Sequence, residues 1–564
     1  MSPRQNDTIL FLTGQIFRVK ICQMMKKEKI NILLSILTGV LTALSFEPFS
    51  ISILGFVAYV PLFFVLSRTE KSLWKSLAYA WLSMFVTIMI SFQWIHFVSV
   101  EFGLLSKSMA FLVLIVFSIF TNLSLQIFSI LYHFAARLSG WIKGRVFYFI
   151  IIPSLFVISE FLDPRIFSWY IGNLLSSFTY LPQFADFFGV YGLSFFVILI
   201  NICFFILIND FIKHRSLYYK RILPEILTLV SVFLFLHVYG YYNYKHTQKI
   251  EDTCPKIRAA VIQANIGNPM QLEINQAAKL RKEMHQTKET SDQALILNKY
   301  KMMTRKAVED NNGIELIVWP ETAFPGFYVD RNPQMAEHKY LADSIGIPFL
   351  IGGYYVEYDT GKYYNSAILV SKDKLDYYHK KILLPFGEYM PLGEYIPSLK
   401  SLVPSVGDFS RGSGPKTLDL IINGMEVRFA PTICYEILDS HYVRQMYKKD
   451  AHVFLNLSND SWFGKVEPYQ HLRLTKIRSI EYRRPIIRST NTGVSTIIDM
   501  NGATFGSSKL DKEEILVFDV PICDHRIRTV YSSVGYLFPY ILIVFTGSLA
   551  IFRIRRKKNN ENRS

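Results

Sequence analysis

Eight apolar runs, each close to the length of a membrane-spanning helix, restrict most strongly how this chain can fold. A spanning helix needs about 20 apolar residues, because the hydrocarbon core of a bilayer is about 30 Å thick. Inside the bilayer every backbone polar group must be paired within the chain, and a helix achieves this. We expect spanning helices at 31–47, 51–67, 77–98, 108–133, 146–162, 187–212, 222–242 and 533–552.

The charged residues divide the chain into parts of different character. Residues 1–250 carry 20 Lys+Arg and 10 Asp+Glu, whereas residues 251–552 carry 35 and 34. The first part is therefore membrane-like, and the second is typical of a water-exposed globular domain. We predict an N-terminal extension at 1–30, a seven-helix membrane domain at 31–242, a globular domain at 250–525, the eighth spanning helix at 533–552 and a basic tail at 553–564.

The net charge of +16 indicates the orientation of the helices rather than a nucleic-acid partner. Lys and Arg are retained in loops on the cytoplasmic side of a membrane. With the N-terminus inside, the inner loops and tails hold 22 of these residues, and the short outer loops hold two, Lys107 and Arg165. The extension and the tail are then cytoplasmic, and the globular domain lies outside. In a bacterium with two membranes, this places the chain in the inner membrane and the domain in the periplasm.

The globular part alternates between strand-like and helix-like segments. Polar helical stretches at 275–310, 333–344, 436–447 and 467–482 fall between short runs rich in β-branched residues. This alternation favours an α/β domain. The predicted strands are 257–263, 315–319, 348–353, 365–370, 427–433, 452–457, 485–489, 494–499 and 514–519.

Cys434 is the candidate nucleophile of this domain. It follows the predicted strand 427–433 and precedes a turn into a helix, a place where a thiol can be presented and activated. Taken alone, a buried structural cysteine is the simpler interpretation. Cys22 and Cys203 lie beside or within apolar segments, where a small apolar filler is the better interpretation.

Two loops supply a carboxylate and an amine that suit the chemistry of a cysteine nucleophile. Glu321 follows the strand 315–319 in a loop that Pro320 and Pro325 stiffen, and it can act as a general base. Lys380 lies in a loop with Pro and Gly and can place positive charge against a developing oxyanion. Each residue alone is equally well explained as a surface charge, and the combination carries the hypothesis.

These segments resemble the Glu-Lys-Cys triad of the nitrilase, or carbon–nitrogen hydrolase, superfamily. The matching motifs are WPET at 319–322, YHKKILLPFGE at 378–388 and CYE at 434–436. NLSNDSWFG at 456–464, QHL at 470–472, RRPIIRSTNTG at 483–493 and GVYGLS at 189–194 are also similar. Over roughly residues 31–552 the chain resembles the apolipoprotein N-acyltransferase family, in which a nitrilase domain is set within a multi-spanning membrane domain.

The resemblance implies a bundle of about eight spanning helices joined to a nitrilase-like α-β-β-α sandwich. It implies a catalytic domain that moves an acyl chain from a phospholipid to the N-terminal amine of a diacylglyceryl-cysteine apolipoprotein, through a cysteine thioester. Metal ions, cofactors and nucleic acid play no part in this expectation, and we expect a monomer. Two other functions stay open: a membrane-tethered amide hydrolase, and a transporter or sensor whose domain only binds a ligand.

The resemblance also assigns roles to residues. Glu321 is the base, Cys434 the nucleophile, and Lys380 with the backbone N–H of Tyr435 stabilises the oxyanion. The supporting candidates, which orient Lys380 and the incoming amine or stand behind the triad, are Glu388, Glu436 and Asn365.

Two structural expectations remain. Cys254 and Cys523 bracket the globular domain at its membrane junctions, and in an oxidising compartment they could form a disulfide. The residues at 324–328 and 385–410, rich in aromatic residues, Pro and Gly, form either mobile arms above the site or packed loops.

Overall fold

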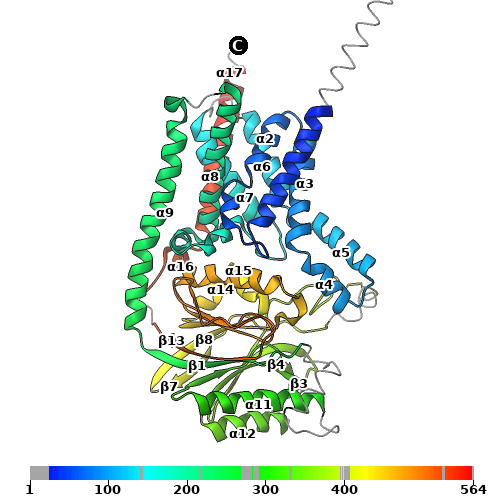
Figure 1. Cartoon of the computed structure of the whole chain (residues 1–564), viewed down its shortest axis with the longest axis vertical. Coiled ribbons are helices and arrows are strands. Elements are labelled where there is room, and N and C mark those ends of the chain that lie inside the picture. Colours follow the sequence, from blue (N-terminus) through cyan, green and yellow to red (C-terminus); the bar gives the residue numbers. More distant parts are fainter. Residues whose placement is uncertain are drawn as a thin grey trace, which may run out of the picture.

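The protein consists of a helical part and a layered α/β domain, stacked along the long axis of the molecule (Figure 1). The computed structural model describes residues 25–138, 144–215, 218–267, 283, 291–329, 333–393, 395–396, 398, 407–523 and 527–561. The predicted extension therefore lies outside the described residues up to residue 24. The predicted helix 275–310 is described mainly from residue 291 onward, as α11 (Asp292–Asp310).

Apolar helices occupy the part of the chain where spanning helices were predicted. Within the described ranges, six helical segments are long and apolar enough to cross a membrane: Ser52–Thr69, Leu73–Ser91, Lys107–Arg137, Leu181–His214, Tyr219–Thr253 and Leu537–Arg556. A shorter apolar helix covers Phe147–Leu162, and residues 25–44 are also helical. The elements are η1 (Ser52–Phe56), α2 (Val60–Thr69), α3 (Leu73–Ser91), α4 (Trp94–Glu101), α5 (Lys107–Phe120), α6 (Ser124–Leu138), η2 (Phe147–Ile151), α7 (Ile152–Leu162), η3 (Ile171–Ser177), η4 (Leu181–Phe184), α8 (Ala185–His214), α9 (Tyr219–Thr253), α16 (Val530–Val534) and α17 (Leu537–Glu561).

Two of the predicted helices are interrupted. The predicted run 77–98 ends as α3 at Ser91, and the predicted run 108–133 is divided between α5 and α6. Asn122 causes the second break: it has a φ of 60°, and its side-chain oxygen accepts a hydrogen bond from the Ser124 hydroxyl at 2.7 Å. Apolar content alone could not show this break. As a result α4 and α5 form an arm beside the bundle, on the right in Figure 1.

The α/β domain is an α-β-β-α sandwich, as expected. In the described part of the chain, the first sheet has the order β13-β1-β2-β4-β5-β6, with β3 beside β4, and the second has the order β12-β11-β10-β9-β8-β7. Helices α11 and α12 (Pro333–Ile345) cover the first sheet at the far end of the molecule (Figure 1). Helices α14 (Ser440–Tyr447) and α15 (Glu467–Tyr482) lie between the second sheet and the helical part.

All nine predicted strands are present, and four more were missed. The predicted strands are β1 (Lys256–Gln263), β2 (Leu316–Val318), β4 (Phe349–Val356), β5 (Tyr363–Val370), β8 (Met425–Ile433), β9 (Val453–Ser458), β10 (Ile486–Thr490), β11 (Thr496–Ile498) and β13 (Glu514–Pro521). The missed strands are β3 (Phe324–Val329), β6 (Leu375–His379), β7 (Leu418–Ile422) and β12 (Thr504–Phe505). Three of these, β6, β7 and β12, are outermost in their sheets, where weaker burial leaves a weaker sequence pattern.

Buried polar contacts join α15 and Arg483, the residue that follows it, to the helical part. Arg473 Nε lies 2.8 Å from Glu47 Oε1, and Arg483 Nη2 lies 2.6 Å from Asp186 Oδ2. Gln470 donates to the carbonyl of Ser91 at 2.8 Å. These side chains are almost completely buried. Because a buried charge left without its partner is strongly destabilising, these pairs hold the α/β domain in one position against the helical part.

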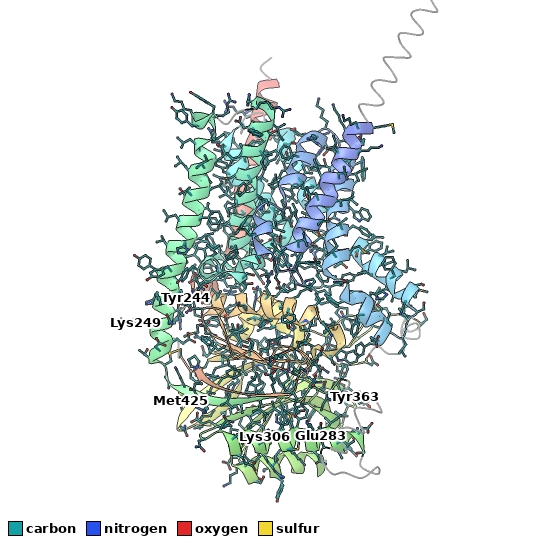
Figure 2. The ribbon with its side chains drawn as sticks, viewed as in Figure 1. Tyr244, Lys249, Glu283, Lys306, Tyr363 and Met425 are labelled. Atoms are coloured by element: carbon teal, nitrogen blue, oxygen red, sulfur yellow. A yellow bond between two sulfur atoms is a disulfide. The ribbon has the colours of Figure 1, made fainter. Side chains whose placement is uncertain are left out.

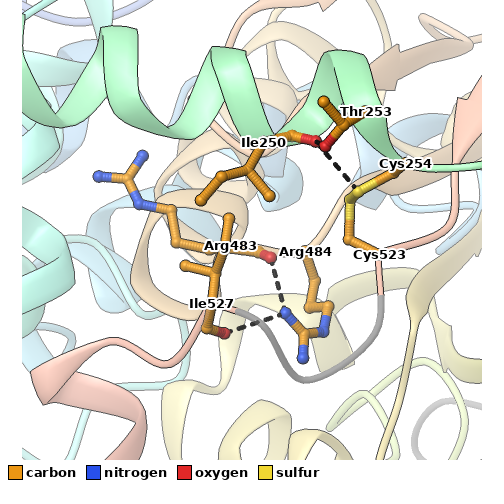
Figure 3. The surroundings of a disulfide bond; sticks show 7 residues. All are labelled: Ile250, Thr253, Cys254, Arg483, Arg484, Cys523 and Ile527. Carbon is orange, nitrogen blue, oxygen red and sulfur yellow. Dashed lines mark hydrogen bonds between the residues drawn. A yellow bond between two sulfur atoms is a disulfide. The ribbon is translucent and has the colours of Figure 1, made fainter.

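A disulfide joins the two ends of the α/β domain. Cys254 follows α9 and Cys523 follows β13, and their Cα atoms are 5.2 Å apart across a sequence separation of 269 residues. Figure 3 shows the bond beside Arg483 and Arg484, where Arg484 Nη1 donates to the carbonyl of Ile527 at 3.3 Å. The predicted disulfide is therefore confirmed.

Replacing either disulfide cysteine with serine is expected to lower the free energy of unfolding by about 2–4 kcal/mol, because the crosslink restricts the unfolded chain. Cys254→Ser, Cys523→Ser and the double variant are compared by chemical denaturation in detergent. The double variant should lose no more than either single variant, since each single change already removes the whole crosslink. Additive losses would contradict this prediction.

Candidate active site

The three predicted triad residues come together, each in the loop that follows a strand. Glu321 follows β2, Lys380 follows β6, and Cys434 follows β8 as the first residue of η5 (Cys434–Leu438). Cys434 has a φ of 54°, a backbone conformation that residues other than glycine rarely adopt and that often marks a functional position. β2 and β6 belong to the first sheet and β8 to the second, so the site lies where the two sheets meet.

A hydrogen-bonded network fixes the carboxylates around Lys380. Lys380 Nζ lies 3.5 Å from Glu321 Oε1 and 2.9 Å from Glu388 Oε1. The amide of Asn365 donates to both carboxylates, at 2.7 Å to Glu321 and 2.8 Å to Glu388. The backbone N–H of Asn459 donates to the other oxygen of Glu321 at 2.8 Å. Glu388 and Asn365, both predicted as supporting residues, thus contact the triad directly.

Burial and neighbouring charges set the protonation of these groups. Burial raises the pKa of the Glu321 carboxyl, and the Lys380 ammonium only partly opposes this. Burial lowers the pKa of Lys380, but Glu388 and Glu321 outweigh it and raise that pKa well above its usual value. Burial and the nearby Glu321 raise the pKa of the Cys434 thiol well above its usual value. The resting site therefore holds a thiol, a charged amine and a carboxyl of increased basicity.

Glu436 and Tyr435 support the loop that carries Lys380. Glu436 accepts hydrogen bonds from the backbone N–H groups of Lys381 at 2.7 Å and Ile382 at 2.9 Å. The Tyr435 hydroxyl donates to the Leu383 carbonyl at 2.5 Å. Glu436 thus positions the backbone next to Lys380, while Glu388 contacts the ammonium itself.

A buried charged network behind Cys434 was not assigned a role from the sequence. Asn456 donates to the Cys434 carbonyl at 2.9 Å, and its own carbonyl oxygen accepts a hydrogen bond from Arg488. Arg488 Nη2 pairs with Asp460 Oδ2 at 2.8 Å, and both side chains are fully buried. The motifs at 456–464 and 483–493 contained these residues, but residue type alone did not show which backbone group they hold.

Among the described residues, Asp460, Glu467 and His471 form a group with metal-ligand chemistry. His471 Nδ1 lies 3.6 Å from Glu467 Oε1 and 3.9 Å from Asp460 Oδ1. However, Asp460 already accepts hydrogen bonds from Ser458 and Arg488. A cation bound here would lie beside the Arg488 guanidinium, so these residues do not fit a metal centre.

An aromatic wall from the helical part lies against the site. The Phe167 ring lies 6.5 Å from the Tyr435 ring and 5.4 Å from the Trp94 ring, measured between centroids. Trp94 in turn lies 5.4 Å from Phe463 in η6 (Asp460–Phe463). Tyr435, the residue after Cys434, is therefore packed against apolar side chains of the membrane-type helices and their loops.

The fold and this site define a class of protein: a carbon–nitrogen hydrolase domain joined to membrane helices. The profile of the carbon–nitrogen hydrolase family matches residues 258–525, and that of the apolipoprotein N-acyltransferase N-terminal domain matches residues 38–203. The apolipoprotein N-acyltransferase of Bdellovibrio bacteriovorus is 32% identical, with 93% of this chain and 94% of that protein covered. The chain belongs to the apolipoprotein N-acyltransferase family and is a membrane acyltransferase of lipoprotein maturation.

Other relatives agree with this family. The apolipoprotein N-acyltransferases of Geobacter metallireducens and Haemophilus influenzae are 29% and 26% identical, each with 93% of this chain covered and with 95% and 96% of their own lengths covered. A solved carbon–nitrogen hydrolase from Helicobacter pylori G27 aligns with 50% of this chain and 94% of its own, at 16% identity and a TM-score of 0.34. The relatives named as apolipoprotein N-acyltransferases favour acyl transfer over the amide-hydrolase alternative.

Proposed function

We propose that this enzyme transfers an acyl chain from a phospholipid to the N-terminal amine of a diacylglyceryl-cysteine apolipoprotein, by way of a thioester on Cys434. The geometry around Glu321, Lys380 and Cys434 carries the proposal, because it combines a nucleophile, a base and a fixed positive charge in one buried site. The site holds the three functions that acyl transfer needs without a further group.

In the first half-reaction, Glu321 accepts the proton of the Cys434 thiol, and the sulfur attacks the ester carbonyl carbon of the donor. Lys380 and the backbone N–H of Tyr435 stabilise the resulting oxyanion. The carbon–oxygen ester bond then breaks, and Glu321 returns the proton to the oxygen of the departing lysophospholipid. The acyl chain is left on Cys434 as a thioester.

In the second half-reaction, the amine of the apolipoprotein attacks the thioester carbonyl carbon. Glu321 accepts a proton from the attacking nitrogen, the carbon–sulfur bond breaks, and the proton passes to the Cys434 sulfur. An amide is formed and the enzyme is regenerated. Water must stay away from the thioester in the meantime, and the buried site with its wall of Phe167 and Trp94 supports that requirement.

We further propose that the α/β domain lies in the periplasm, that both termini are cytoplasmic and that the enzyme acts as a monomer. The distribution of Lys and Arg between the predicted loops supports the orientation. The Cys254–Cys523 disulfide supports it as well, because disulfides persist on the oxidising side of the membrane. Labelling intact cells with a membrane-impermeant thiol reagent tests this orientation. A cysteine introduced on the surface of the α/β domain should react, and one introduced in a terminal segment should not.

The direct test supplies purified enzyme with a phospholipid carrying a radiolabelled acyl chain and with a diacylglyceryl-cysteine peptide. The label should first appear on the enzyme, in a bond that hydroxylamine cleaves, and then pass to the peptide amine. Release of free fatty acid in the presence of the peptide, without peptide labelling, would favour hydrolysis instead.

Replacing Asn365 with leucine is expected to move the acid limb of thioester formation to higher pH. The reaction needs Glu321 as a carboxylate, and the Asn365 hydrogen bond lowers the pKa of that carboxyl. Removing the hydrogen bond raises this pKa, so a higher pH is needed for the same fraction of carboxylate. Single-turnover acylation of Cys434, measured across pH, checks the direction. A uniform loss of rate with an unmoved limb would contradict the prediction.

A further inference from the structure

A polar cavity lies beside the candidate triad. It has a volume of about 660 Å³, and its walls come from 361–364, where β5 begins, and from described residues in 383–395 and 408–411. Leu383 lines this cavity, and its carbonyl accepts the hydrogen bond from Tyr435. Tyr363, another lining residue, lies on the same side of the view as the α4–α5 arm in Figure 2. The cavity and the site therefore share one loop.

Backbone contacts tie the cavity wall to Lys380. The N–H of Gly412 donates to the Lys380 carbonyl at 2.8 Å, and the N–H of Phe409 donates to the Glu388 carbonyl at 3.1 Å. A Cβ at Gly412 would lie 2.0 Å from the His379 carbonyl oxygen, so only glycine permits this close approach. Arg411 is thereby held one residue from a direct backbone contact with Lys380.

Arg411, an exposed residue, places a cation at the wall of the cavity. Its guanidinium lies 4.8 Å from the centroid of the Tyr389 ring, and no carboxylate in the described part of the chain forms an ion pair with it. Lys362 lines the same cavity. The charged residues of the lining are thus two cations, Lys362 and Arg411, and one carboxylate, Asp408. A stacked guanidinium keeps its N–H edge available, and Arg with Lys is the usual pair for phosphate oxygens. The cavity chemistry is therefore that of an anion site.

One wall of this cavity belongs to a loop with exposed apolar side chains, of which Leu392 and Tyr395 line the cavity. Phe386, Leu392, Tyr395 and Ile396 are 60%, 63%, 83% and 46% exposed. Exposed apolar groups beside a cationic cavity suit a ligand that has an anionic group and hydrocarbon chains together. A phospholipid has this composition, whereas a polar peptide does not need the apolar rim.

We propose that this cavity binds the phosphodiester of the acyl donor, with Arg411 and Lys362 contacting its oxygens. This inference rests on the proposed function, because it assumes a phospholipid donor. It makes the two cations determinants of donor specificity: they hold the headgroup while the ester carbonyl lies at Cys434.

The test measures single-turnover acylation of Cys434 by two donors in the same detergent micelles: phosphatidylethanolamine and a diacylglycerol of identical acyl chains, which has no phosphate. In the Arg411→Gln and Arg411→Gln/Lys362→Gln variants, the ratio of kcat/KM for the phospholipid to that for the diacylglycerol should fall about 10- to 100-fold. The loss should appear mainly in KM. Arg305→Gln, an exposed position on α11, is the matched control and should leave the ratio unchanged.

Glycerophosphoethanolamine, the headgroup without chains, should inhibit the unaltered enzyme and lose potency against Arg411→Gln. An unchanged ratio, or equal losses with both donors, would overturn the headgroup site. If phosphatidylethanolamine and phosphatidylglycerol both fail to acylate Cys434 in the unaltered enzyme, the proposed function fails instead, so the two failures are distinguishable.

Discussion

Replacing Cys434 with serine is expected to abolish thioester formation and to lower N-acylation by about 10⁴-fold or more. Serine has a far higher pKa than a thiol, and the buried Glu321 is placed to accept a thiol proton. Lys380 and Glu321 remain in the variant, so any residual rate measures what the serine hydroxyl achieves with the same base and the same positive charge. Transfer of a labelled acyl chain to a diacylglyceryl-cysteine peptide, with trapping of the enzyme-bound label, measures both steps.

Cys203→Ser is the matched control for this experiment. Within the described residues, Cys203 and Cys434 are the two free cysteines, and both are buried. Cys203 lies in α8, in the helical part, so its replacement should leave labelling of the enzyme intact. A hydroxylamine-labile label that persists in Cys434→Ser, together with continued N-acylation, would show that a thiol other than Cys434 carries the acyl chain, because an acyl group on the introduced serine is an oxygen ester.

Replacing Arg488 with methionine is expected to lower the free energy of unfolding by about 3–5 kcal/mol. The variant leaves the Asp460 carboxylate buried without its guanidinium, which is the costly way to break a buried ion pair. It also removes the hydrogen bond to Asn456, the residue that holds the Cys434 carbonyl. The rate of thioester formation should therefore fall in the fraction that remains folded. Chemical denaturation in detergent and single-turnover acylation measure the two effects.

Two comparisons separate the ion pair from the general effect of losing an arginine. Arg258→Met breaks an exposed pair with Asp519, 3.5 Å apart, and should cost at most about 1 kcal/mol. The double variant Asp460→Asn/Arg488→Met removes the unpaired charge and should recover much of the lost stability. Equal losses in the single and double variants would show that the pair itself is not responsible.

The sequence predicted much of the site because its chemistry depends on residue type in a local context. Glu321, Lys380 and Cys434 each follow a strand, and the structure brings them together as expected. Glu388 and Asn365 were also named, and both contact the network directly. The roles of Asn456 and Arg488 were missed, because a side chain that supports a backbone carbonyl has no distinctive local pattern.

The apolar runs located the spanning helices but not their interruptions. Hydropathy averages over a window, so it did not detect the break at Asn122 or the end of α3 at Ser91. The break at Asn122 depends on its own side chain, which accepts a hydrogen bond from Ser124 at the start of the next helix. The arm of α4 and α5 that results is a tertiary feature, because its position depends on aromatic contacts such as Phe102 with Trp462.

The sequence by itself determined the fold class, apolar helices with an α/β domain, and it named the candidate triad residues, because burial periodicity and residue chemistry are local properties. Only the tertiary structure decided how the parts meet. Arg473 and Arg483 reach Glu47 and Asp186 across hundreds of residues of chain, and Phe167 comes to lie against Tyr435. These contacts join groups with no sequence proximity, and their energy depends on mutual burial, which exists only once the chain is folded.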